Sequence, residues 1–265
     1  DHGRNYVEET YKRPFFDRLF RNVLSFVLPR PKVFLVLAYI TKLIKPFSFL
    51  LPTFLKNSLN LMPNKIPSKK IETQKIYKPE SGKIISRVAL LTGCVQRVIS
   101  PEINESTIRI LNRHNVEVVV MPEIECCGSL NHHLGKKDLA HQSFVQNIEK
   151  WHDEYITNGL DAIISNTSGC GTTLKDYGHI FKNDNDLKKK AKKISELTKD
   201  VTEYLEESLD LKIKTNDEKK YKIAYHSACS MQHGQKVHQQ PKDLISKTGN
   251  EVIDIPEGHL CCGSA

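Results

Sequence analysis

Apolar residues recur at helical spacing through the first 60 positions of the chain. Phe16, Leu19 and Val23 illustrate the spacing, and prolines such as Pro29 and Pro46 interrupt it. The pattern predicts several short amphipathic helices over residues 1–60. Such a segment suits a membrane surface, but packing against another part of a longer protein is the favoured interpretation.

Residues 61–85 are polar and carry little apolar periodicity, which predicts a linker. From Ile84 onward, short β-branched runs alternate with helical stretches. This βαβαβ order predicts an α/β fold, with a mostly parallel sheet covered by helices. The predicted elements are strands over Val88–Leu91, Val116–Met121 and Ala162–Ser165, with helices near Pro101–His114 and Asp138–Thr157.

A long charged helix, about Asp186–Leu209, leads to a second set of elements. That set comprises strands over Ile223–Tyr225 and Val252–Ile255 and a helix near Pro241–Lys247. Because the chain starts at Asp1 and stops just after a motif, we expect a fragment of a longer protein. The expected division is a helical segment 1–60, a linker 61–85, a first repeat 86–185, a connecting helix 186–220 and a truncated second repeat 221–265.

The two sets of elements form an internal repeat. Val88–Cys94 corresponds to Ile223–Cys229, a buried strand that ends in a small-residue turn and a cysteine. After 31 intervening residues in each copy, Cys126-Cys127-Gly128-Ser129 corresponds to Cys261-Cys262-Gly263-Ser264. The second copy has one extra residue between its proline and its cysteine pair.

Each copy therefore ends two parallel strands in cysteine-bearing loops, and such strand ends form the crevice where open α/β sheets bind ligands. In the first copy a third strand leads to Cys170 and brings a fourth thiol to the same edge. Four thiolates suit Zn²⁺ or an iron–sulfur cluster. Buried core cysteines and a single catalytic thiol are the two alternatives, and the repeated pattern disfavours both.

The composition is that of an ordinary globular protein, with 39% hydrophobic and 26% charged residues. Seven cysteines, none of them before Cys94, do not suit a secreted disulfide framework, so we expect a reducing, cytoplasmic setting. The longest apolar run near the N-terminus, Val33–Ile40, is too short to span a bilayer.

The net charge of +8 does not predict a nucleic-acid partner. Part of the surplus lies in the lysine run that starts at Lys188, within a predicted helix that soon carries Glu203. No interleaved aromatic residues or finger spacing accompany the run. A solvated helix face is therefore the favoured interpretation.

At its cysteine motifs the chain resembles the cysteine-rich CCG domain family, which occurs twice in one of the subunits of heterodisulfide reductases. The hallmark is the spacing from Cys94 to Cys126-Cys127-Gly128 and its second copy. Within that family, four stretches resemble the iron–sulfur subunits of glycolate oxidases. They are Leu91–Gln96, Pro101–Asn104, Ser168–His179 and His226–Gln235.

The resemblance implies an electron-transfer subunit that receives electrons from a flavin-bearing subunit oxidising glycolate. Electrons would pass toward the quinone pool at the inner face of the cell membrane. FAD would sit on that partner, beside a second accessory subunit. The implied cofactor is an iron–sulfur cluster of the 4Fe–4S type, with Zn²⁺ as an alternative at one repeat. The implied ligands are Cys94, Cys126, Cys127 and Cys170 at one centre and Cys229, Cys261 and Cys262 at a second.

Two departures limit what the resemblance implies. Relatives usually begin with a ferredoxin-like domain, whereas no cysteine precedes Cys94 here. Many relatives also carry a second cysteine at the third loop, where this chain has Thr173. The alternatives are a lactate or glycerol 3-phosphate dehydrogenase subunit, a disulfide-reducing catalytic subunit, and a zinc-binding docking module.

Histidines lie close in sequence to the cysteine motifs, and imidazole can replace thiolate on iron or zinc. We favour a hydrogen-bonded loop role for each of them. His226 and His259 are the strongest candidates for more, since each stands within three residues of a repeated cysteine. The histidines concerned are His132, His133, His179, His226, His233 and His259.

Overall fold

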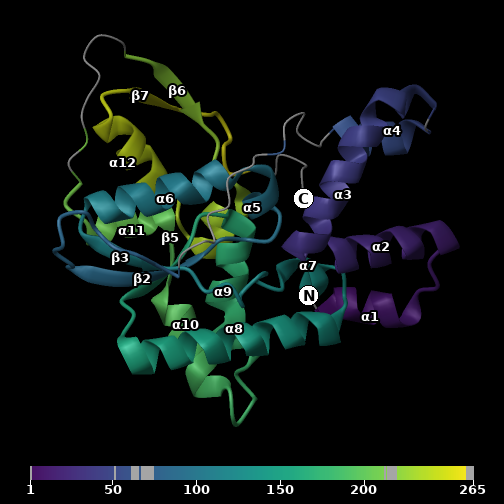
Figure 1. Ribbon diagram of the computed structural model, residues 1–265, viewed down its shortest axis with the longest axis horizontal. Helices are drawn as coiled ribbons and strands as arrows, with labels where there is room; N and C mark the ends of the chain where they lie inside the picture. Colours follow the sequence, from purple (N-terminus) through teal and green to yellow (C-terminus); the bar gives the residue numbers. More distant parts are fainter. Residues whose placement is uncertain are drawn as a thin grey trace.

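A five-stranded sheet lies at the centre of the protein, in a computed structural model that describes residues 2–50, 52–60, 66, 75–211, 213 and 220–260 (Figure 1). The strand order is β1-β3-β2-β4-β5. Neighbouring strands run parallel except β1, which pairs antiparallel with β3 at the edge. The strands are β1 (Ile76–Tyr77), β2 (Ser86–Leu91), β3 (Val116–Val119), β4 (Ala162–Ser165) and β5 (Thr198–Asp200).

Helices cover both faces of this sheet. Ala89 and Leu91 of β2 face one core, while Val88 and Leu90 face the other, as the alternation of a strand requires. The predicted α/β class is therefore confirmed. The first core is closed by α8 (Lys137–Asn158), α9 (Ser168–Ile180) and α10 (Lys188–Leu197), and the second by α6 (Pro101–Arg113) and α11 (Val201–Ser208).

The region expected as one long helix over 186–209, within the connecting helix 186–220, differs in the structure. It forms α10 and α11 with β5 between them, and β5 pairs parallel with β4. The break has a local cause, because Asp200 caps α11 and forms a capping box with Glu203. The Asp-x-x-Glu pattern was the sequence feature that marked this boundary. Strand β1 likewise lies inside the expected linker 61–85.

The N-terminal segment is helical, as predicted, and packs beside the first repeat (Figure 1). Ser25 donates a hydrogen bond to Asn131 Oδ1 at 2.7 Å. Phe34 and Ala38 pack against Val98. The elements involved are α1 (His2–Thr10), α2 (Phe15–Val27), α3 (Pro31–Ile44), η1 (Lys45–Leu50), α4 (Thr53–Asn60), α5 (Gln96–Ile99) and α7 (Ser129–His133).

Within the described residues, no helix is both long and apolar enough to cross a membrane by itself. Helix α2 and the following segment Pro31–Phe49 are together long and apolar enough for a membrane span, by length and composition only. The two parts are bent by 118° relative to each other.

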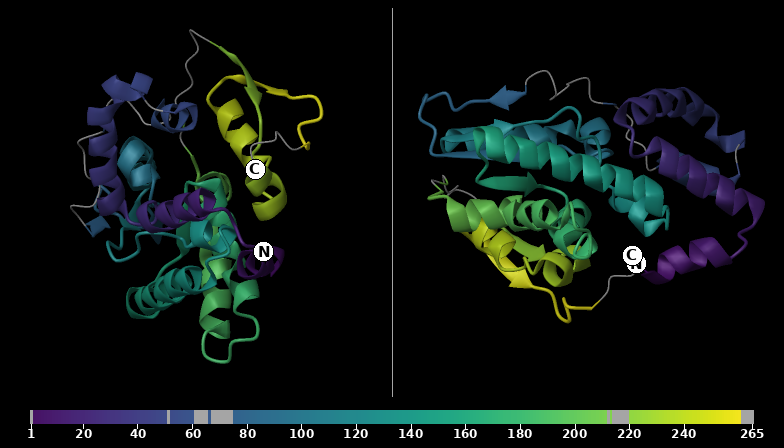
Figure 2. Two further views of the ribbon diagram at one scale, coloured as in Figure 1. Left: turned by 90° about the vertical axis from the view of Figure 1, so that its right-hand side faces the viewer. Right: turned by 90° about the horizontal axis from the view of Figure 1, so that it is seen from below.

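The second repeat forms a two-stranded parallel sheet that lies away from α3 and α4 (Figure 2). It docks on the first repeat through α12, whose Lys247 Nζ lies 2.8 Å from a Glu206 carboxylate oxygen of α11. Its elements are β6 (Lys222–Tyr225), the π-helix η3 (Ser230–Gln235), α12 (Gln240–Lys247) and β7 (Glu251–Asp254).

The two repeats carry the same cross-strand ion pair in different surroundings. Arg87 and Glu117 are register partners on β2 and β3, and Arg87 Nε lies 2.7 Å from Glu117 Oε1. The same guanidinium also pairs with Glu154 of α8, and the two carboxylate side chains are only 8% and 6% exposed. Lys222 and Glu251 occupy the equivalent positions on β6 and β7, where both are exposed.

We expect Arg87→Leu to lower the free energy of unfolding by about 3–5 kcal/mol, because it leaves two buried carboxylates without their cation. The matched control is Lys222→Leu, which should have little measurable effect because its ion pair is exposed. Urea unfolding of both variants measures the difference. Equal effects of the two substitutions would contradict the burial argument.

Candidate metal centre

Four thiols meet where β2, β3 and β4 end. Cys94 follows β2, Cys126 and Cys127 follow β3, and Cys170 lies in the first turn of α9 directly after β4. Strand β2 lies between β3 and β4, so these loops flank the point where the chain's strand order reverses. Cys127 Sγ lies 3.2 Å from Cys170 Sγ, and Cys126 contacts both Cys94 and Cys127. The predicted convergence of the first repeat's thiols is therefore present.

The crowding of these thiols disfavours their ionisation. The neighbouring Cys126 and burial raise the pKa of Cys94, and the contact with Cys127 followed by burial raises the pKa of Cys126 to about 12. For Cys127 the contact with Cys126 lowers the pKa, but the contact with Cys170 and burial outweigh this effect, so the pKa of Cys127 lies well above its usual value. Thiolates at this edge therefore require a compensating positive charge, which a metal centre provides.

The four thiols at this edge are the type of ligand that a soft metal centre prefers. In this structure, however, Cys127 Sγ and Cys170 Sγ lie too close together to share a metal ion. Among the described residues, no group of three or more His, Cys, Asp or Glu side chains is arranged to hold a metal ion. Two sulfurs on a tetrahedral zinc ion lie about 3.8 Å apart, given a zinc–sulfur distance of about 2.3 Å. The 3.2 Å contact between Cys127 and Cys170 would have to open to admit an ion or a cluster.

A glycine lets the Cys126–Cys127 loop turn tightly into α7. Gly128 has φ +82°, a conformation that side chains with a Cβ rarely adopt. A Cβ at this position would also lie 2.5 Å from a ring carbon of Phe144. The backbone N–H of Gly128 points at Cys126 Sγ, 3.4 Å away. Glycine at position 128 therefore allows the tight turn and the close packing of Phe144, and its N–H points at the sulfur of Cys126.

Two buried side chains hold the backbone of the cysteine pair. The Asn147 amide donates to the Cys126 carbonyl at 2.9 Å, and the Tyr177 hydroxyl donates to the Cys127 carbonyl at 2.7 Å. Asn147 also donates to the Tyr177 oxygen at 3.0 Å. Burial raises the pKa of Tyr177 well above its usual value, which keeps the hydroxyl protonated as a donor. These contacts join α8 and α9 to the loop after β3.

A network of side-chain amides joins the other two loops, and the sequence analysis did not identify it. Gln96 donates to Asn104 and to Asn166, at 2.9 and 2.8 Å. Asn104, which is fully buried, donates to the carbonyl of Thr92, two residues before Cys94. The sequence feature that could have indicated this network is Asn104 itself, a polar residue on the buried face of α6, because a buried amide needs hydrogen-bond partners.

Cys229 of the second repeat lies next to the helix that carries Cys170. It immediately precedes η3, which packs on the first turn of α9. The Gln235 amide donates to the Ser168 carbonyl at 2.9 Å, and the Thr172 hydroxyl donates to the Ser230 carbonyl at 3.0 Å. The loop containing the second repeat's first cysteine thus docks on the third cysteine loop of the first repeat.

The remaining predicted residues are distributed as follows. Cys261 and Cys262 lie outside the described residues. His226, His233 and His259 belong to exposed parts of the second repeat, and the His233 ring lies 3.3 Å from the His259 carbonyl oxygen. His132, His133 and His179 line a cavity beside the thiols together with His141, which the sequence analysis did not single out.

Comparison with known protein families identifies the domain family of both repeats. The profile of the cysteine-rich CCG domain matches residues 88–175 and 223–265. Both segments belong to the CCG cysteine-rich domain family. The assignment agrees with the repeated spacing of Cys94 and Cys229 to their downstream cysteine pairs. The matched segments contain all seven cysteines of the chain.

Several curated proteins resemble this chain. It is 35% identical over its whole length to the glycolate oxidase iron–sulfur subunit of Escherichia coli. It is 28% identical, over 81% of its length, to a probable glycolate oxidase iron–sulfur subunit of Bacillus subtilis. It is 29% identical, over 68% of its length, to one subunit of the CoM/CoB fumarate reductase of Methanothermobacter marburgensis.

The chain spans only part of each of these relatives. It covers 61% of the Escherichia coli protein, 48% of the Bacillus subtilis protein and 33% of the Methanothermobacter marburgensis protein. The similarity to the Escherichia coli subunit includes the N-terminal helices as well as both repeats.

We expect Gly171→Ala to destabilise the protein by about 1–2 kcal/mol, because the new Cβ would lie 2.7 Å from the Gln235 amide at the docking face of η3. Gly169→Ala is the matched control, since Gly169 lies on the other side of Cys170 and a Cβ there meets no atom within 4 Å. Urea unfolding measures both variants. Adding Gln235→Ala to Gly171→Ala should restore part of the loss, and no coupling between these two sites would argue against the docking contact.

Proposed function

We propose that this CCG protein forms part of the iron–sulfur electron-transfer subunit of a glycolate oxidase complex. The observation that carries the proposal is the meeting of four thiols at the carboxyl ends of β2, β3 and β4. The 35% identity to the Escherichia coli subunit supports the same assignment. An oxidoreductase role follows, in which substrate oxidation takes place on a partner.

The proposed ligands of the first centre are Cys94, Cys126, Cys127 and Cys170. Cys229, Cys261 and Cys262 are the proposed ligands of a second centre. An iron–sulfur cluster supplies one-electron transfer. The protein's own part is to fix the sulfurs, to donate the Gly128 N–H toward Cys126 Sγ at 3.4 Å, and to keep Cys126 and Cys127 buried, all of which influence a reduction potential.

The wider complex is proposed by resemblance to the glycolate oxidase relatives. A flavin subunit carrying FAD would oxidise glycolate and pass electrons to the thiol-held centres, with a second accessory subunit beside it. The electrons would leave toward the quinone pool at the inner face of the cell membrane, with the subunit itself in the cytoplasm. A cluster of the 4Fe–4S type is the proposed cofactor.

Lactate is the second candidate substrate of the complex. The chain is 26% identical, over 66% of its length, to the lactate utilization protein A of Anoxybacillus flavithermus. A disulfide-reducing role is a further alternative, by the resemblance of the cysteine motifs to those of heterodisulfide reductases. Substrate assays on the assembled complex with glycolate, lactate and glycerol 3-phosphate separate the candidate substrates from one another.

We expect the anaerobically purified full-length protein to contain iron and sulfide and to absorb visible light. Cys127→Ser should remove most of the iron and sulfide of the first centre, because Cys127 is the thiol in contact with both Cys126 and Cys170. The matched control is Ser168→Ala, in the same helical turn as Cys170, which should leave the iron content unchanged. Elemental analysis and absorption spectra measure both.

Zinc without sulfide would contradict the electron-transfer proposal and favour a docking module with structural zinc. The absence of any metal from the full-length protein would contradict it as well. Iron that stays bound in both Cys127→Ser and Cys94→Ser would contradict the proposed ligands while leaving an iron–sulfur protein.

A further inference from the structure

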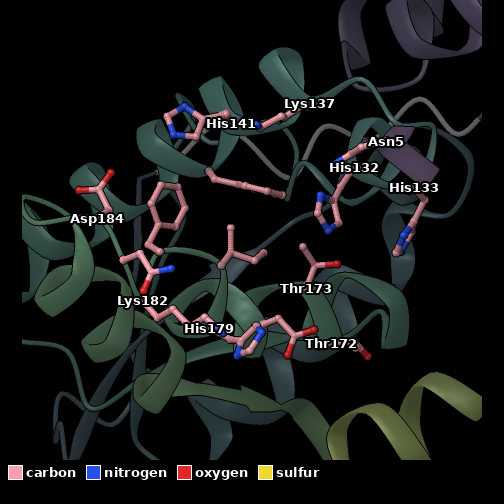
Figure 3. A pocket seen from close by; sticks show the side chains of 15 residues that line it. Asn5, His132, His133, Lys137, His141, Thr172, Thr173, His179, Lys182 and Asp184 are labelled. Atoms are coloured by element: carbon pink, nitrogen blue, oxygen red, sulfur yellow. The ribbon is translucent and has the colours of Figure 1, made fainter. Parts of the chain in front are cut away.

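A cavity of about 720 Å³ opens beside the thiols, between α1, α7, α8 and α9 (Figure 3). Its volume lies within the range of about 300–1,000 Å³ that is usual for small-molecule sites. Four histidines line it, together with Phe144 and Thr173. His132 and His133 come from α7, His141 from α8 and His179 from the end of α9.

One layer of side chains separates this cavity from the thiols. Phe144 forms part of the cavity wall and packs on Gly128, the residue that follows Cys127. The Phe144 ring lies 5.0 Å from the ring of Tyr177, whose hydroxyl bonds the Cys127 carbonyl. Thr173, also in the wall, stands one helical turn after Cys170 on α9. A molecule in the cavity would therefore lie within short range of a centre held by Cys127 and Cys170.

The chemistry of the lining argues against a metal ion and against an anion. Although four imidazoles line the cavity, no group of three metal-binding side chains in the described part of the chain is placed around one ion. Two lysines of the lining, Lys137 and Lys182, are balanced by Asp176 and Asp184. Burial lowers the pKa of both His132 and His133, so these rings are neutral at pH 7. The lining suits an uncharged ligand that accepts hydrogen bonds.

Aromatic and apolar groups form the rest of the wall. The His132 ring meets the Phe144 ring edge to face, with centroids 5.5 Å apart, and Ile180 and Phe181 continue this surface. Nearby, Arg21 of α2 donates to the Leu134 carbonyl at 2.8 Å, which holds α2 against the end of α7. Phe144, Ile180 and Phe181 together offer an apolar surface against which a flat ring can pack.

We propose that this cavity binds the ring of a quinone and is the place where electrons leave the protein. The inference rests on the proposed electron-transfer function. A cluster held by the thiols would supply two electrons, one at a time, and the quinone would take up two protons and become a quinol. Each carbonyl oxygen gains one proton through the imidazole of His132 or His179, which gives up its N–H proton as its other ring nitrogen takes up a proton that comes from solvent. Solvent replaces those protons through the exposed His179 and Asp176.

Equilibrium dialysis of the full-length, cluster-loaded protein tests the inference, with 2,3-dimethoxy-5-methyl-1,4-benzoquinone as the probe and glycolate as the comparison ligand. We expect one quinone per chain. His132→Leu should weaken quinone binding by about threefold to tenfold, the loss of one hydrogen bond. Ile180→Trp should abolish binding by filling the cavity. The matched control is His238→Leu, an exposed histidine outside the cavity, which should bind quinone like the unmodified protein.

Iron content and quinol formation in a single turnover are measured on the same samples. Quinone binding that neither His132→Leu nor Ile180→Trp alters would overturn the inference, and so would binding of glycolate in place of quinone. Loaded iron without any quinone binding would refute the cavity assignment alone. Quinone binding that depends on His132 in a protein without iron would refute the proposed function alone. If His132→Leu fails to fold, His179→Leu, at an exposed position of the same cavity, should weaken quinone binding by the same threefold to tenfold, and quinone binding that it leaves unaltered would overturn the inference.

Discussion

Parallel strands that are joined by helical crossovers all end at one edge of their sheet, and the rest of this structure depends on that constraint. Cysteines separated by up to 76 positions, Cys94 and Cys170, meet because each follows a strand of the same direction. The helices that bury the sheet then fix how closely the loops approach. Thiol convergence here is a consequence of topology, and no local sequence motif would achieve it alone.

Convergence carries an electrostatic cost that shapes the surroundings of the thiols. Contacts with neighbouring thiols, and then burial, raise the pKa of Cys94 and Cys126, so without a cation these groups stay neutral. Three buried polar side chains nearby hold backbone carbonyl groups of the cysteine loops. Asn147 and Tyr177 bond the carbonyls of the cysteine pair, while Asn104 bonds the carbonyl of Thr92. A metal centre at this edge would therefore have to displace the thiol protons and open the 3.2 Å contact between Cys127 and Cys170.

Much of the fold and part of the site could be predicted from the sequence. The strands that carry the first repeat's cysteine loops are short buried runs, and their predicted positions agree closely with β2, β3 and β4. Strand β5 escaped prediction because Thr198 and Asp200 are polar, and only tertiary burial makes them part of the sheet. The repeated cysteine spacing pointed to a shared edge, since unrelated core cysteines have no reason to repeat. Asn147 and Tyr177 gave no such pattern, because they act on the cysteine loop from two different helices.

The contrast between the two repeats follows from how much of each sheet is buried. Parallel sheets are normally covered on both faces, and β2 is covered in this way while β6 and β7 are largely exposed. A two-stranded sheet has little stability of its own. The second repeat therefore relies on the first, through α12 on α11 and through η3 on α9. Since η3 follows Cys229 and α9 carries Cys170, the contact that stabilises the second repeat also sets the position of Cys229 relative to the helix that carries Cys170.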